Sequence, residues 1–167
     1  MSPSAETNEE ISADVEVTTS DVERVERALI DASTRLPVLV FYTSAIAWLL
    51  LATFFGILTS FKMHSPDFLS GTAFLTWGRI RPVHLNALIY GWGSMAGMGT
   101  AIWLMARLCR TTLRHPLLLI SGAAFWNLGV LIGIGAILAG DTTGYEWLEF
   151  PGYSAVMLFI AYLLIMT

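Results

Sequence analysis

The amino-acid sequence predicts an all-α integral membrane protein with four membrane-spanning helices preceded by a disordered acidic tail. Two observations support this fold class. Hydrophobic residues make up 55% of the 167 residues and charged residues 13%, and the mean hydropathy is +0.65, which is typical of membrane proteins. Four apolar stretches, bounded by charged residues, prolines or glycines, follow one another from residue 36 onward. We therefore expect a transmembrane domain over residues 36–167.

The charged residues are unevenly distributed along the chain. Nine of the 13 acidic residues lie between Glu6 and Asp31, so the net charge of −4 belongs mainly to the N-terminal region. The basic residues form small clusters at the ends of apolar stretches, which argues against a nucleic-acid partner. Cys109 is the only cysteine and allows no internal disulfide. We expect it to be a small buried residue at a helix end.

The N-terminal region divides into two predicted parts. Residues 1–19 contain many Ser, Thr, Glu and Asp residues and few large apolar ones, which predicts a disordered tail. Over residues 20–35, Val22, Val25 and Leu29 recur at helical spacing among Glu and Arg, which predicts an amphipathic helix on the membrane surface. The region lacks the basic start and short apolar core of a signal peptide.

The four apolar stretches are read as membrane spans. The first has no charged residue over roughly 20 positions or more, which is enough to cross the hydrocarbon core, and Pro37 is expected in its first turn. Prolines also open the second and third spans. The fourth is still apolar when the sequence ends after 15 residues, so we expect the chain to be the front part of a longer protein. The predicted spans cover about residues 36–61, 82–106, 116–140 and 153–167.

The basic residues predict the orientation of these spans. Short loops rich in Lys and Arg remain in the cytoplasm. Three arginines precede the first span and three follow the second, whereas residues 141–152 contain no basic residue. This predicts a cytoplasmic N-terminus and an outer acidic loop. Arg79 and Arg81 lie on the outer side, where the rule does not expect them, so they need a reason of their own.

His84 lies at the outer end of the predicted second span. Ionisable residues inside membrane segments are functional by default, and the positive potential of a helix N-terminus favours a neutral imidazole that can bind a metal. The alternative is a histidine that bonds a neighbouring backbone group or reaches the interface. Gly91 lies on the same side of the helix, at seven-residue spacing. Small residues on that side suit a flat macrocycle bound to His84. Gly93 and Gly97 form a G-x-x-x-G, and this spacing alternatively lets a second membrane helix approach closely.

Arg79 and Arg81 complete the local pattern. Two guanidinium groups beside a helix N-terminus form an anion site that suits carboxylates such as haem propionates. The alternative is that both are interfacial anchors that reach lipid phosphates. Their place on the outer side favours the first interpretation.

Residues 77–87, W-G-R-I-R-P-V-H-L-N-A, resemble the second transmembrane helix of the catalytic subunit of haem-copper oxidases. They are most similar to the C family, the cbb3-type cytochrome c oxidases, whose signature is R-P-x-H-T-N-A; Leu85 stands where threonine is usual. The resemblance runs from the first span to the end of the chain, and it implies that the four spans begin a twelve-helix fold. It also implies that His84 is one of two axial ligands of the low-spin haem b. Arg81 and Arg79 would then lie near the haem propionates, with Gly91 facing the haem.

The acidic loop carries a second similarity. G-Y-E-W-L-E over residues 144–149 is similar to the family's G-x-E-aromatic-x-E. The resemblance implies that Glu146 helps to hold a calcium ion linked to the haem propionates and that Glu149 supports it. Carboxylate oxygens suit calcium, although two glutamates in an exposed loop are more often simply solvated.

The resemblance implies a function for the complete subunit. It would be a respiratory terminal oxidase of the bacterial inner membrane that reduces dioxygen with electrons from cytochrome c, coupled to proton pumping. The portion in hand would supply one ligand of low-spin haem b and no catalytic residue, since the second axial histidine and the ligands of the high-spin haem and copper lie on later helices. Its partners would be the lipid bilayer, the remaining helices of subunit I and cytochrome c-type haem subunits.

Two alternatives stay open at this point. Nitric oxide reductase large subunits share the superfamily and a similar histidine motif. The chain would alternatively be a small membrane scaffold protein that binds no haem and has no catalytic role.

Overall fold

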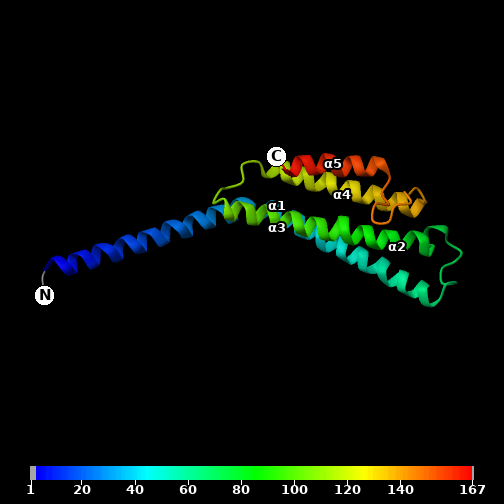
Figure 1. Ribbon diagram of the computed structural model, residues 1–167, viewed down its shortest axis with the longest axis horizontal. Coiled ribbons are helices and arrows are strands. Elements are labelled where there is room, and N and C mark those ends of the chain that lie inside the picture. The colour runs from blue at the N-terminus through cyan, green and yellow to red at the C-terminus, as the bar shows by residue number, and fades with distance from the viewer. Residues whose placement is uncertain (1–2, 167) are drawn as a thin grey trace.

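A computed structural model describes the backbone of residues 3–166 and the side chains of residues 19–166. The described chain is helical, with short loops between the helices (Figure 1). The element η1 is a single 3₁₀ turn and η2 is a π-helix. In chain order the elements are α1 (Pro3–His64), η1 (Ala73–Leu75), α2 (Trp77–Asn86), η2 (Ala87–Gly93), α3 (Ser94–Leu108), α4 (Pro116–Ala139) and α5 (Gly152–Met166).

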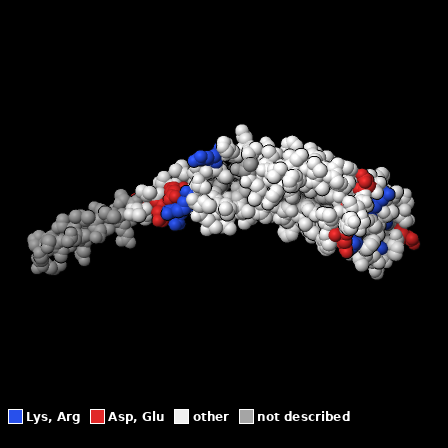
Figure 2. Space-filling view, turned by 45° about the horizontal axis from the view of Figure 1, so that its top comes forward, with Lys and Arg blue, Asp and Glu red and all other residues white. Residues whose placement is uncertain are grey.

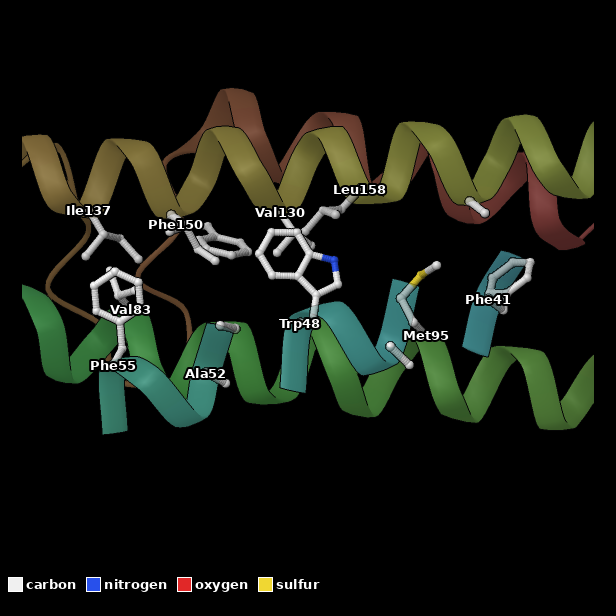
Figure 3. Packing of buried hydrophobic residues seen from close by; sticks show 14 of the residues in the cluster. Phe41, Trp48, Ala52, Phe55, Val83, Met95, Val130, Ile137, Phe150 and Leu158 are labelled. Atoms are coloured by element: carbon white, nitrogen blue, oxygen red, sulfur yellow. The ribbon is translucent and has the colours of Figure 1, made fainter. Parts of the chain in front are cut away.

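The helices pack in two groups. Helix α1 lies along α2, η2 and α3, which together form one continuous helical segment, and α5 lies along α4. Helix α4 also contacts α1 and α2, and buried apolar side chains fill the space between the groups. Figure 3 shows Trp48 of α1 pointing toward Val130 of α4, while Phe55, Val83 and Ile137 meet further along. Burial of these side chains holds the two groups together.

Charged residues gather at the two ends of the helical body, with an uncharged band between them on the face shown in Figure 2. We call the end with residues 62–86 and 138–151 the His84 end, and the end with residues 104–118 the Arg107 end. By length and composition, two described helices, Thr19–His64 and Pro116–Ala139, are apolar enough to cross a membrane. Helix α5 is a shorter apolar helix.

The N-terminal region differs from its prediction. Instead of a tail over residues 1–19, a surface helix over 20–35 and a span that starts at 36, helix α1 runs without a break from Pro3 to His64; residues 1 and 2 lie outside the described residues. Residues 4–36 contain neither Gly nor Pro, so nothing in the local sequence ends the helix. Pro37 lies inside the helix rather than in its first turn, where it removes one backbone hydrogen bond.

Two further predictions were wrong. The second predicted span began at Pro82, but helix α2 begins at Trp77, so both outer arginines lie within it. Pro82 lies inside this helix, beyond its first turn, where it removes one backbone hydrogen bond. Cys109 does lie at a helix end, as the cap of α3, but it is exposed rather than buried. The backbone leaves the helix at Arg110, with a φ of 50°, and the following loop does not cover the thiol.

Helix α4 has boundaries close to those predicted. Pro116 is in its first turn, and Gly140, with a φ of 95°, lies just after its end. The left-handed conformation favours glycine. The N–H groups of Gly140 and Asp141 bond to the carbonyls of Ile137 and Ala136, which ends the helix in an ordered turn. The acidic loop that follows contacts the start of α2, where Glu146 pairs with Arg81.

Candidate functional site

His84 lies on helix α2 and its ring is held against α1. The Nδ1 atom is 2.8 Å from the backbone carbonyl oxygen of Ala52. Because a carbonyl oxygen only accepts hydrogen bonds, Nδ1 is the protonated nitrogen and donates to it. In the neutral ring this leaves Nε2 unprotonated and available as a ligand. No described residue forms a hydrogen bond with Nε2.

Gly56 makes room for this ring. A Cβ atom at Gly56 would lie 2.8 Å from Cε1 and 2.9 Å from Nδ1 of His84, closer than real Cβ atoms come to such neighbours. Ala52 and Gly56 are one helical turn apart on α1, so one contributes the carbonyl and the other the space. Neither residue was predicted from the sequence. Their four-residue spacing of small side chains in an apolar helix is the signal that points to such a contact.

The hydrogen bond of His84 is of a kind that metal-binding histidines commonly form. Histidines that bind metals commonly donate their other ring N–H to a backbone carbonyl or a carboxylate, which fixes the tautomer and the orientation of the ring. The His84 to Ala52 hydrogen bond is of this kind. Within the described part of the chain, no three His, Cys, Asp or Glu side chains cluster to hold a metal ion. Haem iron is held by single side chains such as His, Met, Cys or Tyr and does not need such a cluster.

Asn86 forms a buried polar pair with Glu149. Its Nδ2 atom donates to Glu149 Oε2 and to the Pro82 carbonyl, both at 2.8 Å. Asn86 is 1% exposed and Glu149 6% exposed. The Asn86 Oδ1 atom is also buried and has no hydrogen-bond partner among the described residues. No role was predicted for Asn86 from the sequence, although a polar residue two positions after His84 in an apolar helix was a usable signal.

The two outer arginines have separate partners. Arg81 forms an ion pair with Glu146, at 2.7 Å between Nη2 and Oε1, and its guanidinium lies 5.6 Å from the ring centre of Trp77. Arg79 donates from Nη1 to the carbonyl of Leu138, at 2.8 Å, near the end of α4. Both arginines therefore fasten the start of α2 to the region that connects α4 and α5. No described contact joins the two guanidinium groups to one common acceptor.

The predicted calcium residues lie in the same region but face different partners. Glu146 pairs with Arg81 on the surface, whereas Glu149 is buried beside Asn86. Calcium takes about six to eight oxygen ligands, and the described residues bring together no third acidic side chain here. The calcium site stays a prediction that rests on the resemblance.

Gly91 lies in the π-helical segment η2 and packs against Trp48. A Cβ at Gly91 would lie 2.6 Å from Cγ and 2.7 Å from Cβ of Trp48. Gly91 therefore allows α1 to pack closely against this segment, and its predicted place facing a haem stays a prediction. The G-x-x-x-G pair, Gly93 and Gly97, is exposed and does not form the expected close helix contact within the described residues. A Cβ at Gly97 would meet no atom within 4 Å.

Side-chain hydrogen bonds connect the π-helix η2 to its neighbours and pair two of its backbone carbonyls. Its wider turns change which backbone carbonyls are paired. The indole N–H of Trp126 on α4 donates to the Tyr90 carbonyl at 2.8 Å, and the Ser94 hydroxyl donates to the Ile89 carbonyl at 2.9 Å. The Tyr90 hydroxyl donates to the Trp147 carbonyl at 2.9 Å. Segment η2 therefore connects the helix that carries His84 to both α4 and the acidic loop.

Comparisons with known proteins agree on one family. The family model for cytochrome c and quinol oxidase polypeptide I matches residues 37–167. A Cbb3-type cytochrome c oxidase subunit CcoN1 from Stutzerimonas stutzeri is 28% identical over 113 residues, which are 65% of this chain and 23% of that protein. A cytochrome c oxidase subunit 1 homolog from Agrobacterium tumefaciens (strain T37) is 27% identical over 121 residues, 71% of this chain and 22% of that protein. The chain thus spans less than a quarter of the length of these relatives.

Proposed function

Because the chain belongs to the cytochrome c and quinol oxidase polypeptide I family, we propose that it is the N-terminal part of the catalytic subunit of a respiratory terminal oxidase, in which His84 is one axial ligand of a low-spin haem b. The observation that carries the ligand assignment is the hydrogen bond from His84 Nδ1 to the Ala52 carbonyl. It leaves Nε2 as the unprotonated nitrogen. The space at Gly56 supports the same assignment.

The residues around His84 have distinct roles in this proposal. Ala52 and Gly56 fix the tautomer and the orientation of the imidazole, so little reorganisation is needed when the iron binds. Arg81 is partly exposed and provides positive charge near the start of α2, where propionate carboxylates would be attracted. Arg79 is directed to the end of α4 and adds to the same positive potential. The haem supplies one-electron transfer; the protein controls it through ligand identity, charge and burial.

The complete protein would carry a high-spin haem and copper in addition to haem b, bound by segments outside this chain. We propose that it reduces dioxygen with electrons from cytochrome c, coupled to proton pumping, and that it assembles with cytochrome c-type haem subunits. Both relatives described above have names that specify cytochrome c oxidase subunits. Those names favour an oxidase over a nitric oxide reductase.

We also propose how the chain lies in a bacterial inner membrane. Helix α1, the continuous segment α2–η2–α3, helix α4 and helix α5 would each enter the bilayer as the first four spans of a twelve-helix subunit. The Arg107 end, with its excess of arginine, would face the cytoplasm. The uncharged band between the two charged ends supports this placement (Figure 2).

The ligand assignment is tested in the full-length protein with His84→Ala. The low-spin haem b bands in the absorption spectrum should be lost. His64→Ala is the matched control, because His64 is exposed at the end of α1 and should leave the spectrum unchanged. His84→Met guards against a simple folding defect: methionine also binds haem iron, so it should retain haem with shifted bands. Unchanged low-spin bands in purified His84→Ala would show that another residue is the ligand.

A further inference from the structure

Buried residues recur at every fourth position along the continuous segment of α2, η2 and α3. These positions are occupied by Val83, Ala87, Gly91, Met95 and Gly99. In a regular α-helix, four residues turn about 40° more than one full turn, so four such steps accumulate about 160°. Gly99 would then lie on the side of the helix opposite to Val83. The wider turns of the π-helix η2 rotate the chain less per residue and offset this drift, so the buried residues stay on one side.

The same wider turns set the direction of His84. His84 lies on α2, which continues into η2 without a loop. Each extra residue that a π-helical turn takes up rotates the helix before it by about 100° relative to the helix after it. Helix α3 is held against α1, because a Cβ at Gly99 would lie 2.9 Å from Cβ of Phe41. If η2 returned to a regular α-helix, α2 would therefore rotate and turn His84 away from Ala52 and Gly56.

Two consecutive residues of α4 hold η2 in this form. The indole N–H of Trp126 donates to the Tyr90 carbonyl at 2.8 Å. The Oδ1 atom of Asn127 accepts a 2.7 Å hydrogen bond from the indole N–H of Trp48, whose atoms leave no room for a Cβ at Gly91. Trp126 thus bonds the backbone of η2 directly, and Asn127 fixes the aromatic side chain against which η2 packs. Interhelical hydrogen bonds of this kind tie membrane helices together.

We propose that Trp126 is a positioning residue for the axial ligand: its hydrogen bond to the Tyr90 carbonyl holds the π-helix η2, and η2 sets the rotation of α2 that directs His84. This inference rests on the proposed role of His84 as a ligand of haem b. Trp126 acts through the backbone of η2 and needs no contact with the haem. The orientation of a ligating imidazole is one of the means by which a protein tunes a bound metal, so a change at Trp126 reaches the iron through His84.

The test uses the full-length complex with Trp126→Phe, which keeps an aromatic ring but removes the indole N–H. Amide hydrogen exchange over residues 87–93 should become about fivefold faster, the effect of one hydrogen bond on local opening. Low-spin haem b should remain bound, but the g-values of its electron paramagnetic resonance signal should shift, because they depend on the orientation of the axial imidazole. Trp103→Phe is the matched control: it also removes an indole N–H that donates between helices, to Asp31, and should leave both measurements unchanged.

A second variant loosens η2 without touching α4. Ser94→Ala removes the hydroxyl that donates to the Ile89 carbonyl. It should also speed exchange over residues 87–93 and shift the g-values, and it decides the proposal if Trp126→Phe does not assemble.

Two outcomes would overturn the proposal. Faster exchange with unchanged g-values would show that Trp126 only fastens α4 to η2, and unchanged exchange would show that its hydrogen bond does not hold the π-helix. Retention of unchanged low-spin haem b in His84→Ala would contradict the ligand assignment itself. That failure is distinguishable, because exchange over residues 87–93 would still respond to Trp126→Phe.

Discussion

The two ends of the helical body carry charged pairs that are exposed to a similar degree, but among the described residues only the His84 end also has buried charged side chains. At the Arg107 end, Asp31 accepts two hydrogen bonds of 2.7 Å from Arg107, whose side chain is 32% exposed while that of Asp31 is 42% exposed. The Arg81 to Glu146 pair at the His84 end is exposed to a comparable degree. An exposed pair of this kind contributes little to stability.

The difference lies below the surface pairs. At the His84 end, Asn86 and Glu149 are almost completely buried, and the half-buried His84 ring is held between α1 and α2. Burial of polar groups costs free energy unless they are paired. A membrane protein that only needed anchoring would have no reason to carry them there. Ion pairs and hydrogen bonds of arginines hold helices together at both ends, whereas buried polar groups around the proposed ligand are found at the His84 end.

The largest expected effect comes from Gly91, which packs against Trp48. Gly91→Ala would place a Cβ 2.6 Å from Cγ of Trp48. The atoms of Trp48 that it meets are close to the backbone and cannot swing away, so we expect a loss of about 3 kcal/mol in the free energy of unfolding. Thermal denaturation of the full-length protein in detergent measures it. Gly97→Ala is the control, since nothing lies within 4 Å of its Cβ. Equal effects of Gly91→Ala and Gly97→Ala would show that the close contact between Gly91 and Trp48 is not what stabilises the fold.

The buried pair gives the next largest effect. Asn86→Leu keeps a similar branched side-chain shape but leaves the Glu149 carboxylate without its buried donor. We expect a loss of about 2 kcal/mol in the free energy of unfolding. The double variant with Glu149→Leu should recover most of that loss, because both buried polar groups are then replaced together. If the single and double variants are equally unstable, the hydrogen bond between the two side chains is not the cause.

A smaller effect is expected next to the proposed ligand. Gly56→Ala should push the His84 ring, because the new Cβ would lie 2.8 Å from Cε1. The ring can tilt, so we expect about 1 kcal/mol of destabilisation together with a shift of the haem b absorption bands. Gly135→Ala on α4 provides the matched control, with no atom within 4 Å of its Cβ. An unchanged haem b absorption spectrum in Gly56→Ala would show that Gly56 does not set the orientation of His84.

The smallest effect is expected at the Arg107 end. Arg107→Gln removes an ion pair that is partly exposed, so the midpoint of thermal unfolding should fall less than in any of the three variants above. The decrease should shrink further in roughly 1 M salt, which screens exposed charges. A decrease as large as that of Asn86→Leu would mean that the two ends do not differ in the way described here.

Some features of this protein followed from the sequence alone because they depend on neighbours in the chain. Hydropathy over about 20 consecutive residues predicts a helix that can cross a bilayer. Pro116 and Gly140 mark the start and end of α4, because each has a restricted or unusual backbone preference. His84 was recognisable as an ionisable residue in an apolar segment, and the motif around it identified the family that the comparisons support.

Predictions from neighbouring residues failed where the same stretch of sequence is compatible with more than one structure. The polar N-terminal region has neither glycine nor proline, so its composition did not reveal that the helix continues through it. The environment of Cys109 depends on where the next loop passes. Neither the length of helix α1 nor the exposure of Cys109 is determined by a short stretch of sequence.

Only the tertiary structure decided the surroundings of His84. Its bond to the Ala52 carbonyl spans 32 residues, and the bond between Asn86 and Glu149 spans 63. Both depend on how each helix is rotated about its axis relative to the helix beside it. A single sequence states which residues share a face but not which face meets which neighbour, because that is set by the packing of all the helices together.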